Sequence, residues 1–428
     1  WYAHASVGCL HVRPILNLKL DQDLKAMRAI AEEAHELVRS FGGTHSGEHG
    51  DGLVRSEFLK PMLGSRLVAA FGEIKSAFDP SGTLNPGKIV DPSRMDDRSL
   101  MRYRSGYGPL PITTELDWSD LGGWVGATEM CNNNGACRKT DPGVMCPSYR
   151  ATGDERHTTR GRANTLRLAL TGQLGSEALT SSEMYDTLSL CVGCKACAKE
   201  CPTGVDMARM KIEFLHHYHR RWGLPLRERL VAWLPRYARY AARVPALTNV
   251  GKPGGLLART VERVLGLTAR RERPRWRRDV FRGPAGSYCG AAKAARPSAE
   301  EEDLRPEVLL WVDTFNTYFE PENAHAAYRV LEAAGYRVCL PTPSGRPVCC
   351  GRTFLNAGLI EEARHEGRRL LSALSPWVVR GVPIVGLEPS CLLTLRDELP
   401  AILPGEESAG PLAEGSFLLD EFLLREAE

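Results

Sequence analysis

Four cysteines in the run CVGCKACAKECP constrain this chain more than any other feature of its sequence. They are Cys191, Cys194, Cys197 and Cys201, and a proline follows the last of them. The C-x2-C-x2-C-x3-C-P spacing is typical of iron–sulfur ligation, in which three thiolates surround one cluster and the fourth binds a second. A zinc knuckle or disulfide pairs are the weaker alternatives, because zinc sites usually use two separated C-x2-C pairs. The run therefore predicts a 4Fe-4S cluster and one-electron transfer.

A second cysteine group lies upstream, in CNNNGACRKTDPGVMCP. Aligned on the same pattern, Cys131, Cys137 and Cys146 take the first, third and fourth positions, and Asn134 takes the second. An amide is a poor ligand for iron, because iron–sulfur clusters select soft thiolates. This group is therefore one ligand short.

In two-cluster ferredoxins, the fourth cysteine of each run binds the cluster of the other run. The same arrangement here divides the seven thiolates between two sites. The complete set consists of Cys146, Cys191, Cys194 and Cys197. The incomplete set consists of Cys131, Cys137 and Cys201. We expect a 4Fe-4S cluster in the complete set. For the incomplete set, a three-iron cluster, a four-iron cluster with a non-thiolate ligand, no stable cluster, and simple buried thiols all stay open.

The composition sets the remaining bounds. The chain has 428 residues, a length that suits about three domains. Its net charge of +3 gives no reason to expect nucleic-acid binding. The thirteen cysteines are clustered, which favours metal ligation in a reducing compartment over a disulfide framework. No apolar run reaches the length of a membrane-spanning helix, so we expect a cytoplasmic protein.

Changes of pattern along the chain predict a multi-domain α+β protein with five segments. They are an α+β domain at 1–95, a linker at 96–125, a helical ferredoxin-type domain at 126–215, a basic connecting segment at 216–305 and a small α/β domain at 306–428. Helical spacing of apolar residues predicts helices from Leu24 to Phe41 and from Leu63 to Phe78. After residue 306, strands in VLLWVD, YRVCLP and PIVGLEP alternate with helices at 324–334 and 359–374.

The basic segment interleaves arginines with aromatic residues. They are Arg220, Arg221, Trp222, Arg227, Arg229, Trp233, Arg236, Tyr237, Arg239, Tyr240, Arg243, Arg259, Arg263 and Arg270. The simpler interpretation is a solvated helical face whose long side chains cover the core. The alternative is a surface that docks on an anionic membrane face or on an acidic electron carrier. No recognition motif accompanies the charge, so nucleic acid is not an expected partner.

Histidines mark the start of the chain. His4 and His11 lie in YAHASVGCLH, where a strand–turn–strand would bring them together, and Glu48 and His49 lie in the glycine-flanked loop SGEHGDG. Two histidines and a carboxylate are a common divalent-metal set, and a neighbouring histidine can serve as general base. Arg13 could pair with a substrate carboxylate. Ordinary hydrogen-bonded loop histidines are the alternative.

Three ordered blocks resemble the C-terminal domain of the FAD-linked oxidases, a family that includes D-2-hydroxyglutarate and D-lactate dehydrogenases and glycolate oxidase. The blocks are YAHASVGCLHVRP, SGEHGDGLVRSEFL and FDPSGTLNPGKIV. The resemblance implies that His4, His11 and Glu48 bind a divalent metal, with zinc expected, that holds a 2-hydroxy acid. It also implies that His49 removes the hydroxyl proton while hydride passes to FAD, and that Asn85 lies near the flavin.

One departure from that family concerns the first block. The chain reads SVGCLH where the family often reads GDGNLH, and Arg13 stands where asparagine is common. The metal ligands are kept, so the departure implies a change in which acid is accepted.

The C-terminal segment resembles the CCG cysteine-rich domain of heterodisulfide-reductase-like and glycolate-oxidase-like iron–sulfur subunits. Cys349, Cys350 and Cys391 carry this resemblance, and adjacent thiolates can bridge a non-cubane cluster. The family motif has a further upstream cysteine, and here Asp313 ends the first strand, with Cys339 as a candidate substitute. A third cluster, zinc and no metal all stay open.

Together the resemblances imply a fused FAD- and iron–sulfur-dependent D-2-hydroxyacid dehydrogenase, with its FAD-binding domain expected upstream of residue 1. D-2-hydroxyglutarate is the favoured substrate and D-lactate the next. Electrons would pass through the 4Fe-4S cluster to a quinone, a cytochrome or a flavoprotein, with peripheral contact to the inner membrane face as an open alternative. A non-catalytic electron-transfer subunit and a heterodisulfide-reductase-like enzyme are the rival functions.

Overall fold

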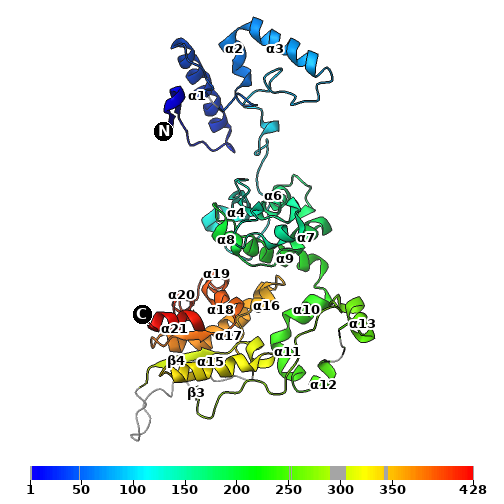
Figure 1. Cartoon of the computed structure of the whole chain (residues 1–428), viewed down its shortest axis with the longest axis vertical. Helices are drawn as coiled ribbons and strands as arrows, with labels where there is room; N and C mark the ends of the chain where they lie inside the picture. Colours follow the sequence, from blue (N-terminus) through cyan, green and yellow to red (C-terminus); the bar gives the residue numbers. More distant parts are fainter. Residues whose placement is uncertain are drawn as a thin grey trace. The chain divides into compact units, whose positions relative to one another are not determined.

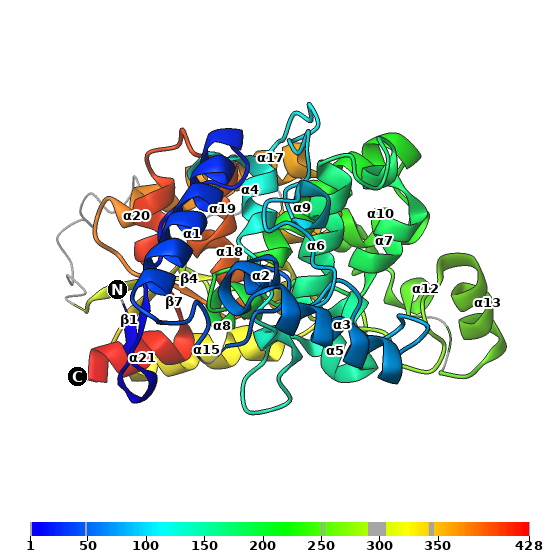
Figure 2. The same cartoon turned by 90° about the horizontal axis from the view of Figure 1, so that it is seen from above.

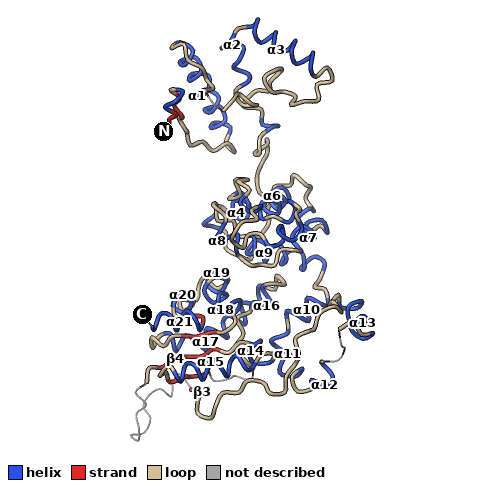
Figure 3. The backbone as a smooth tube through the Cα atoms, viewed as in Figure 1, coloured by secondary structure: helices blue, strands red, loops and turns tan. Residues whose placement is uncertain are grey.

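The computed structural model of this chain describes residues 2–47, 49–249, 251, 253–289, 305–341 and 346–427. The chain divides into two compact units, Trp1–Gly108 and Pro109–Glu428. Figure 1 shows the first unit in blue to cyan, and Figure 3 shows that helices and loops dominate it.

The first unit combines a two-stranded ribbon with helices. Strands β1 (Tyr2–His4) and β2 (Cys9–His11) pair antiparallel, with Tyr2 opposite His11. Its helices are α1 (Asp21–Ser40), α2 (Leu59–Leu63) and α3 (Ser65–Phe78). The predicted helices at 24–41 and 63–78 are confirmed within two or three residues. Arg28 of α1 donates hydrogen bonds to Glu57 and Asp96, which fixes the end of this unit to its first helix.

The second unit begins with a helical part. Its helices are α4 (Gly123–Glu129), α5 (Pro147–Thr152), α6 (Thr159–Leu170), α7 (Ser182–Ser189), α8 (Ala196–Glu200) and α9 (Met207–Trp222). Side-chain oxygens of Thr158, Ser181 and Asp206 cap α6, α7 and α9, as expected for these residue types at helix starts. Figure 2 shows α6, α7 and α9 close together, and α6 contacts both of the others.

Short helices connect this part to a sheet. They are α10 (Leu226–Ala232), α11 (Leu234–Ala241), α12 (Pro245–Thr248) and α13 (Leu256–Leu265). Prolines stand at the start of α11 and α12, where the missing N–H costs nothing. These helices lie within the segment predicted to be basic and partly amphipathic.

A parallel five-stranded sheet forms the end of the second unit, in the order β3-β5-β4-β6-β7. The strands are β3 (Tyr288–Cys289), β4 (Glu307–Trp311), β5 (Arg337–Pro341), β6 (Ile384–Gly386) and β7 (Ser416–Leu418). The predicted strands of 306–428 are β4, β5 and β6, so their alternation with helices is confirmed. The order reverses between β4 and β6, which makes this point the topological switch of the sheet.

Helices cover both faces of the sheet. They are α14 (Thr314–Tyr318), α15 (Pro321–Ala333), α16 (Arg352–Leu355), α17 (Ile360–Val378), α18 (Pro389–Arg396), α19 (Glu398–Ile402), α20 (Ala409–Glu414) and α21 (Leu419–Ala427). Val308 and Leu310 pack with α15 and α21, whereas Leu309 and Trp311 pack with α17. This alternation is what a strand between two helical layers requires.

The helical part and the sheet part pack on each other. His219 of α9 has its Nδ1 2.9 Å from the carbonyl oxygen of Ala357. Residues 109–118 also belong to this unit, because buried Glu213 accepts hydrogen bonds from the backbone N–H groups of Glu115 and Leu116. Part of the stretch predicted to be a linker is thus packed here, while the five-segment division remains a prediction. Across the described residues, the structure has no helix long and apolar enough to cross a membrane.

Candidate metal and iron–sulfur sites

The ribbon and the glycine-rich loop bring three histidines together in the first unit. The pairing of β1 with β2 puts Tyr2, His4 and His11 on one face. The ligand nitrogens of His4, His11 and His49 all lie within 4.8 Å of one another, and the rings of His4 and His11 are 4.6 Å apart. A divalent ion is commonly held by such imidazoles.

The loop approaches the ribbon closely. A Cβ added to Gly47 would lie 3.2 Å from Sγ of Cys9 on β2, so only glycine fits there without a shift. Glu48, which was predicted as the third metal ligand, lies outside the described residues. The assignment of ligands and of a base within this group therefore remains a prediction.

Arg13 and Asn85 are the other predicted site residues of this unit. The Arg13 guanidinium lies 5.8 Å from the ring centre of Tyr2, whose edge faces His4. Asn85 has a left-handed backbone (φ 45°) and accepts a hydrogen bond from Lys88. Tyr2 therefore contacts both Arg13 and His4, which places Arg13 next to the histidine group.

A second histidine pair supports the loop, and the sequence analysis missed it. His45 Nε2 lies 2.8 Å from a carboxylate oxygen of Asp51, and the centre of its ring lies 4.9 Å from that of the His35 ring, tilted by 54°. Burial, assisted by the charges of His45 and Arg39, lowers the pKa of His35. The ten-residue separation of His35 and His45 has no characteristic pattern, so no sequence signal could have found this contact.

The structure brings the four cysteines of the complete set together. One cavity of the second unit is lined by the four cysteines of that set, Cys146, Cys191, Cys194 and Cys197, together with Arg162. Burial raises the pKa of Cys197 to about 12, so a bound cation is needed to hold it as a thiolate.

Arg162 tests whether the cavity suits an anionic cluster. Its Nη1 lies 3.6 Å from Sγ of Cys146, and its Nε donates to the carbonyl oxygen of Thr187. Among the described residues, its third nitrogen is buried without a hydrogen-bond partner. A buried cation with a spare donor beside four cysteines fits a cluster that carries negative charge.

In the region of the incomplete set, Asn134 and Cys201 have local partners. Cys131 and Cys137 are buried, but the Asn134 side chain is engaged locally, accepting from the N–H of Ala136 at 2.8 Å and donating to Asn132. The sulfur of Cys201 lies 3.4 Å from the hydroxyl oxygen of Thr203. The Asn134 side chain is used in a local turn, and this disfavours it as the fourth ligand of the incomplete set.

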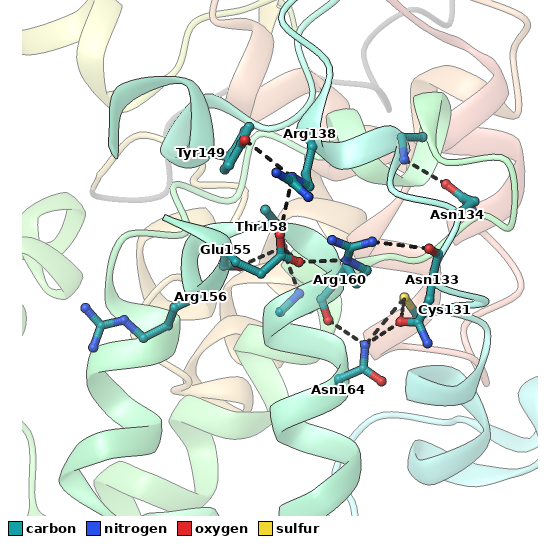
Figure 4. Close-up of polar contacts among 12 residues, drawn as sticks. Cys131, Asn133, Asn134, Arg138, Tyr149, Glu155, Arg156, Thr158, Arg160 and Asn164 are labelled. Atoms are coloured by element: carbon teal, nitrogen blue, oxygen red, sulfur yellow. Dashed lines mark hydrogen bonds and ion pairs between the residues drawn. The ribbon is translucent and has the colours of Figure 1, made fainter. Parts of the chain in front are cut away.

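Polar side chains surround Cys131 in Figure 4. Asn164 donates to Asn133 at 2.8 Å and lies 4.0 Å from the Cys131 sulfur. Arg160 donates to the Asn133 carbonyl and pairs with Glu155 at 2.7 Å. These contacts fix the loop that would carry the incomplete set.

The three C-terminal cysteines form one buried cluster. The thiol of Cys350 is hydrogen-bonded to those of Cys349 and Cys391. Cys349 and Cys350 follow β5 and Cys391 follows β6, so the cluster lies at the carboxyl edge of the parallel sheet near its switch point, where such sheets bind ligands. The hydrogen bond with Cys350, together with burial, raises the pKa of Cys349 well above that of a free thiol.

Asp313 and Cys339 have other partners. Asp313 caps α14 by accepting from the N–H groups of Phe315 and Asn316 at 2.7 and 3.1 Å. The thiol of Cys339 is hydrogen-bonded to Cys289 on the edge strand. The suggestion that Cys339 replaces the missing family cysteine thus receives no support from its contacts.

Arg352 joins the two thiol-rich regions of the second unit. It follows the CCG run directly, donates to the carbonyl oxygen of Gly193 at 3.1 Å, and forms an ion pair with Glu398. Gly193 lies between Cys191 and Cys194, and neighbouring Lys195 reaches the same Glu398 at 3.1 Å. The ferredoxin-type loop is therefore held against the CCG run.

Comparison with protein families defines the class of this chain. Residues 1–89 match the C-terminal domain of FAD linked oxidases, and residues 127–205 match a 4Fe-4S dicluster domain. The chain therefore carries a FAD-linked oxidase C-terminal domain followed by an iron–sulfur domain. This confirms the resemblance to the FAD-linked oxidases and the iron–sulfur prediction, while the resemblance of the C-terminal segment to the CCG domain remains a prediction. The first domain implies FAD, and the second implies a 4Fe-4S cluster.

Curated relatives narrow this class. The chain is 30% identical to a D-2-hydroxyglutarate dehydrogenase of Pseudomonas putida, over 95% of this chain and 42% of the relative, and 29% identical to that of Escherichia coli, over 95% and 42%. It is also 32% identical, over 21% of the chain and 19% of the relative, to glycolate oxidase subunit GlcD of Bacillus subtilis. The chain thus spans about two fifths of the dehydrogenases that it matches. No solved structure matches it.

Proposed function

We propose that this chain takes part in oxidising a D-2-hydroxy acid to the 2-oxo acid, with D-2-hydroxyglutarate as the first candidate and D-lactate as the second. The convergence of His4, His11 and His49 within the FAD-oxidase domain carries the proposal. A protein that only transfers electrons does not need these three histidines. The names of the relatives support the choice of substrate.

We assign a role to each residue of this group and to its neighbours. His4 and His11, with Glu48, would hold a divalent cation, zinc by our expectation, that polarises the substrate hydroxyl when bound. His49 takes the hydroxyl proton, since a neutral imidazole is a general base near pH 7. Arg13 steadies a substrate carboxylate, and Asn85 lies toward the flavin, the hydride acceptor of this chemistry.

Iron–sulfur clusters held by thiolates of the second unit would carry the electrons onward. Cys146, Cys191, Cys194 and Cys197 would hold the first 4Fe-4S cluster. The incomplete set, Cys131, Cys137 and Cys201, is the second, and Cys349, Cys350 and Cys391 form the third. The final acceptor is a quinone, a cytochrome or a flavoprotein.

The test is reduction of the flavin by D-2-hydroxyglutarate in the anaerobically purified protein. We expect His49→Ala to slow flavin bleaching by at least about a hundredfold, because a positioned base contributes that much. Its iron content should stay that of the unchanged protein.

His365→Ala is the matched control, since His365 is exposed on α17 in the other unit. It should bleach at the normal rate. Normal bleaching in His49→Ala would remove the base role. Absence of bleaching by any 2-hydroxy acid, with clusters still reducible by dithionite, would favour the electron-carrier function instead.

A further inference from the structure

A cavity of about 470 Å³ lies between α7, α9 and α10 of the second unit. Its apolar wall includes Leu188, Phe214 and Val231, and its polar lining includes Tyr185, Lys211 and Glu228. This volume and this mixture are typical of sites for small organic molecules. None of the residues assigned above to the hydroxy acid or to a cluster lines it.

At one side of the cavity, three side chains that can carry protons contact one another: Tyr185, Glu228 and His219. The Tyr185 hydroxyl donates to Glu228 at 2.7 Å, and Nε2 of His219 lies 3.2 Å from the other oxygen of Glu228. Glu228 is partly exposed, so protons taken from this group can be replaced from solvent. The three side chains together offer a route for protons into the cavity.

The cavity is also next to the complete cysteine set. Lys211 donates to the carbonyl oxygens of Ser189 and Cys191, at 3.2 and 2.6 Å. Leu188 and Ser189 line the cavity, and the chain runs from them directly into Cys191. A molecule in the cavity would thus lie beside a predicted cluster ligand.

A second, larger cavity adjoins the first. It has a volume of about 700 Å³ and shares three lining residues with it, Arg227, Val231 and Leu267. Its other lining residues include Leu234 and Trp276. Arg271, Arg273 and Arg275 also line the second cavity. The first cavity suits a head group, and the apolar side of the second, with Leu234, Trp276 and Phe319, suits a hydrocarbon tail.

We propose that these cavities bind a lipophilic quinone that takes the electrons of the iron–sulfur domain. The inference rests on the proposed function and names its electron acceptor. Each quinone takes two electrons, delivered one at a time from the cluster of the complete set, and two protons by way of Tyr185, Glu228 and His219, and leaves as quinol. The electrons come from the hydroxy acid.

The lining favours a quinone over the other acceptors. A cytochrome or a flavoprotein docks on an outer surface and needs no internal cavity beside the cluster. A neutral ring with two oxygens can accept hydrogen bonds from Tyr185 and Lys211.

The test starts from full-length protein whose clusters have been reduced by dithionite and then desalted. Decylubiquinone or ferricyanide is added, and return of cluster absorbance is followed by stopped flow. We expect Val231→Trp, which fills the junction of the cavities, and Glu228→Gln, which removes the central carboxylate, to slow reoxidation by the quinone at least about tenfold. Reoxidation by ferricyanide should be unchanged. Calorimetric titration of oxidised protein with decylubiquinone should show binding that Val231→Trp abolishes.

Val379→Trp is the matched control, because Val379 is 85% exposed and lines neither cavity. It should behave as the unchanged protein. Failure of decylubiquinone to bind or to reoxidise the unchanged protein, or normal rates in Val231→Trp, would overturn the quinone site. Dithionite supplies the electrons here, so a protein that no hydroxy acid reduces but that a quinone reoxidises would refute only the proposed function.

Discussion

At the scale of single residues, Glu213 is a fully buried carboxylate that holds the start of the second unit to α9. It accepts hydrogen bonds from the N–H groups of Glu115 and Leu116 at 2.9 and 2.8 Å, and from the Trp118 indole at 3.2 Å. Glu213→Ala leaves these donors unsatisfied. We expect it to lower the free energy of unfolding by about 3 kcal/mol, measured by denaturant titration of the full chain.

The free energy of unfolding that Glu213→Ala loses depends on pH. Burial raises the pKa of Glu213, but hydrogen bonds from His217, Glu115, Leu116 and Trp118 outweigh it, so the pKa is lowered. A lowered pKa stabilises the folded chain above the pKa of an unfolded glutamate, about 4.3, and this stabilisation is lost as the pH falls below it. The difference between Glu213→Ala and the unchanged chain should therefore shrink on acidification. Glu414→Ala, at an exposed glutamate, should cost little, and equal losses in the two variants would contradict the account.

Asn134 decides whether the incomplete cysteine set can hold a cluster. Asn134→Cys supplies the thiolate that the C-x2-C-x2-C pattern lacks. We expect the anaerobically reconstituted variant to contain about four more iron atoms per chain than the unchanged protein. Asn132→Cys, two residues away and outside the pattern, is the control and should add none. If the unchanged protein already binds the extra iron, the set is not defective.

At the scale of elements, Gly358 allows α9 to pack against the loop after α16. It has φ +69°, and an added Cβ would lie 2.4 Å from the backbone nitrogen of His216. Gly381 also has a positive φ, +73°, but an added Cβ would meet nothing within 4 Å. Gly381→Ala should therefore cost only the left-handed strain, about 1 kcal/mol.

Gly358→Ala adds a backbone clash to the same strain. We expect it to lose about 3 kcal/mol, as overpacking at a rigid contact does, measured from denaturant midpoints. Equal losses in the two variants would mean that the two parts of this unit can move apart without cost.

The elements found from the sequence are those with a complete hydrophobic pattern. The strands that became β4 and β5 are buried apolar runs, and α1 and α17 repeat their apolar residues over several turns. The sequence analysis did not find β3, with two residues, or β7, whose three residues run directly into α21. Short elements gain their structure from neighbours rather than from their own pattern.

A site could be predicted from the sequence where its residues lie close together along the chain at a characteristic spacing. The spacing of Cys191, Cys194 and Cys197 and that of His4 and His11 are local, and the structure brings each group together. Cys146 was added to the complete set only by analogy with two-cluster ferredoxins. The contact of Cys350 with Cys391 depends on the order of strands in the sheet, which the sequence did not reveal. The same holds for Arg352 and Gly193, which lie 159 residues apart.

At the scale of the whole molecule, the chemistry is divided between the two units. The histidine group belongs to Trp1–Gly108, and the described cysteine clusters belong to Pro109–Glu428. If the proposed function holds, substrate oxidation and electron export are separate half-reactions that single substitutions can uncouple.

Cys197→Ser should uncouple them, because it removes a buried thiol of the complete cysteine set. We expect D-2-hydroxyglutarate to bleach the flavin at nearly the normal rate, since the histidine group is untouched. Turnover with decylubiquinone should fall at least about tenfold, because electrons reach the quinone only through the cluster. Cys289→Ser, at a thiol outside all three sets, should leave both half-reactions unchanged. Loss of flavin bleaching in Cys197→Ser alone would show that the cluster supports the substrate site structurally. Normal quinone turnover in that variant would show that electrons leave directly from the flavin.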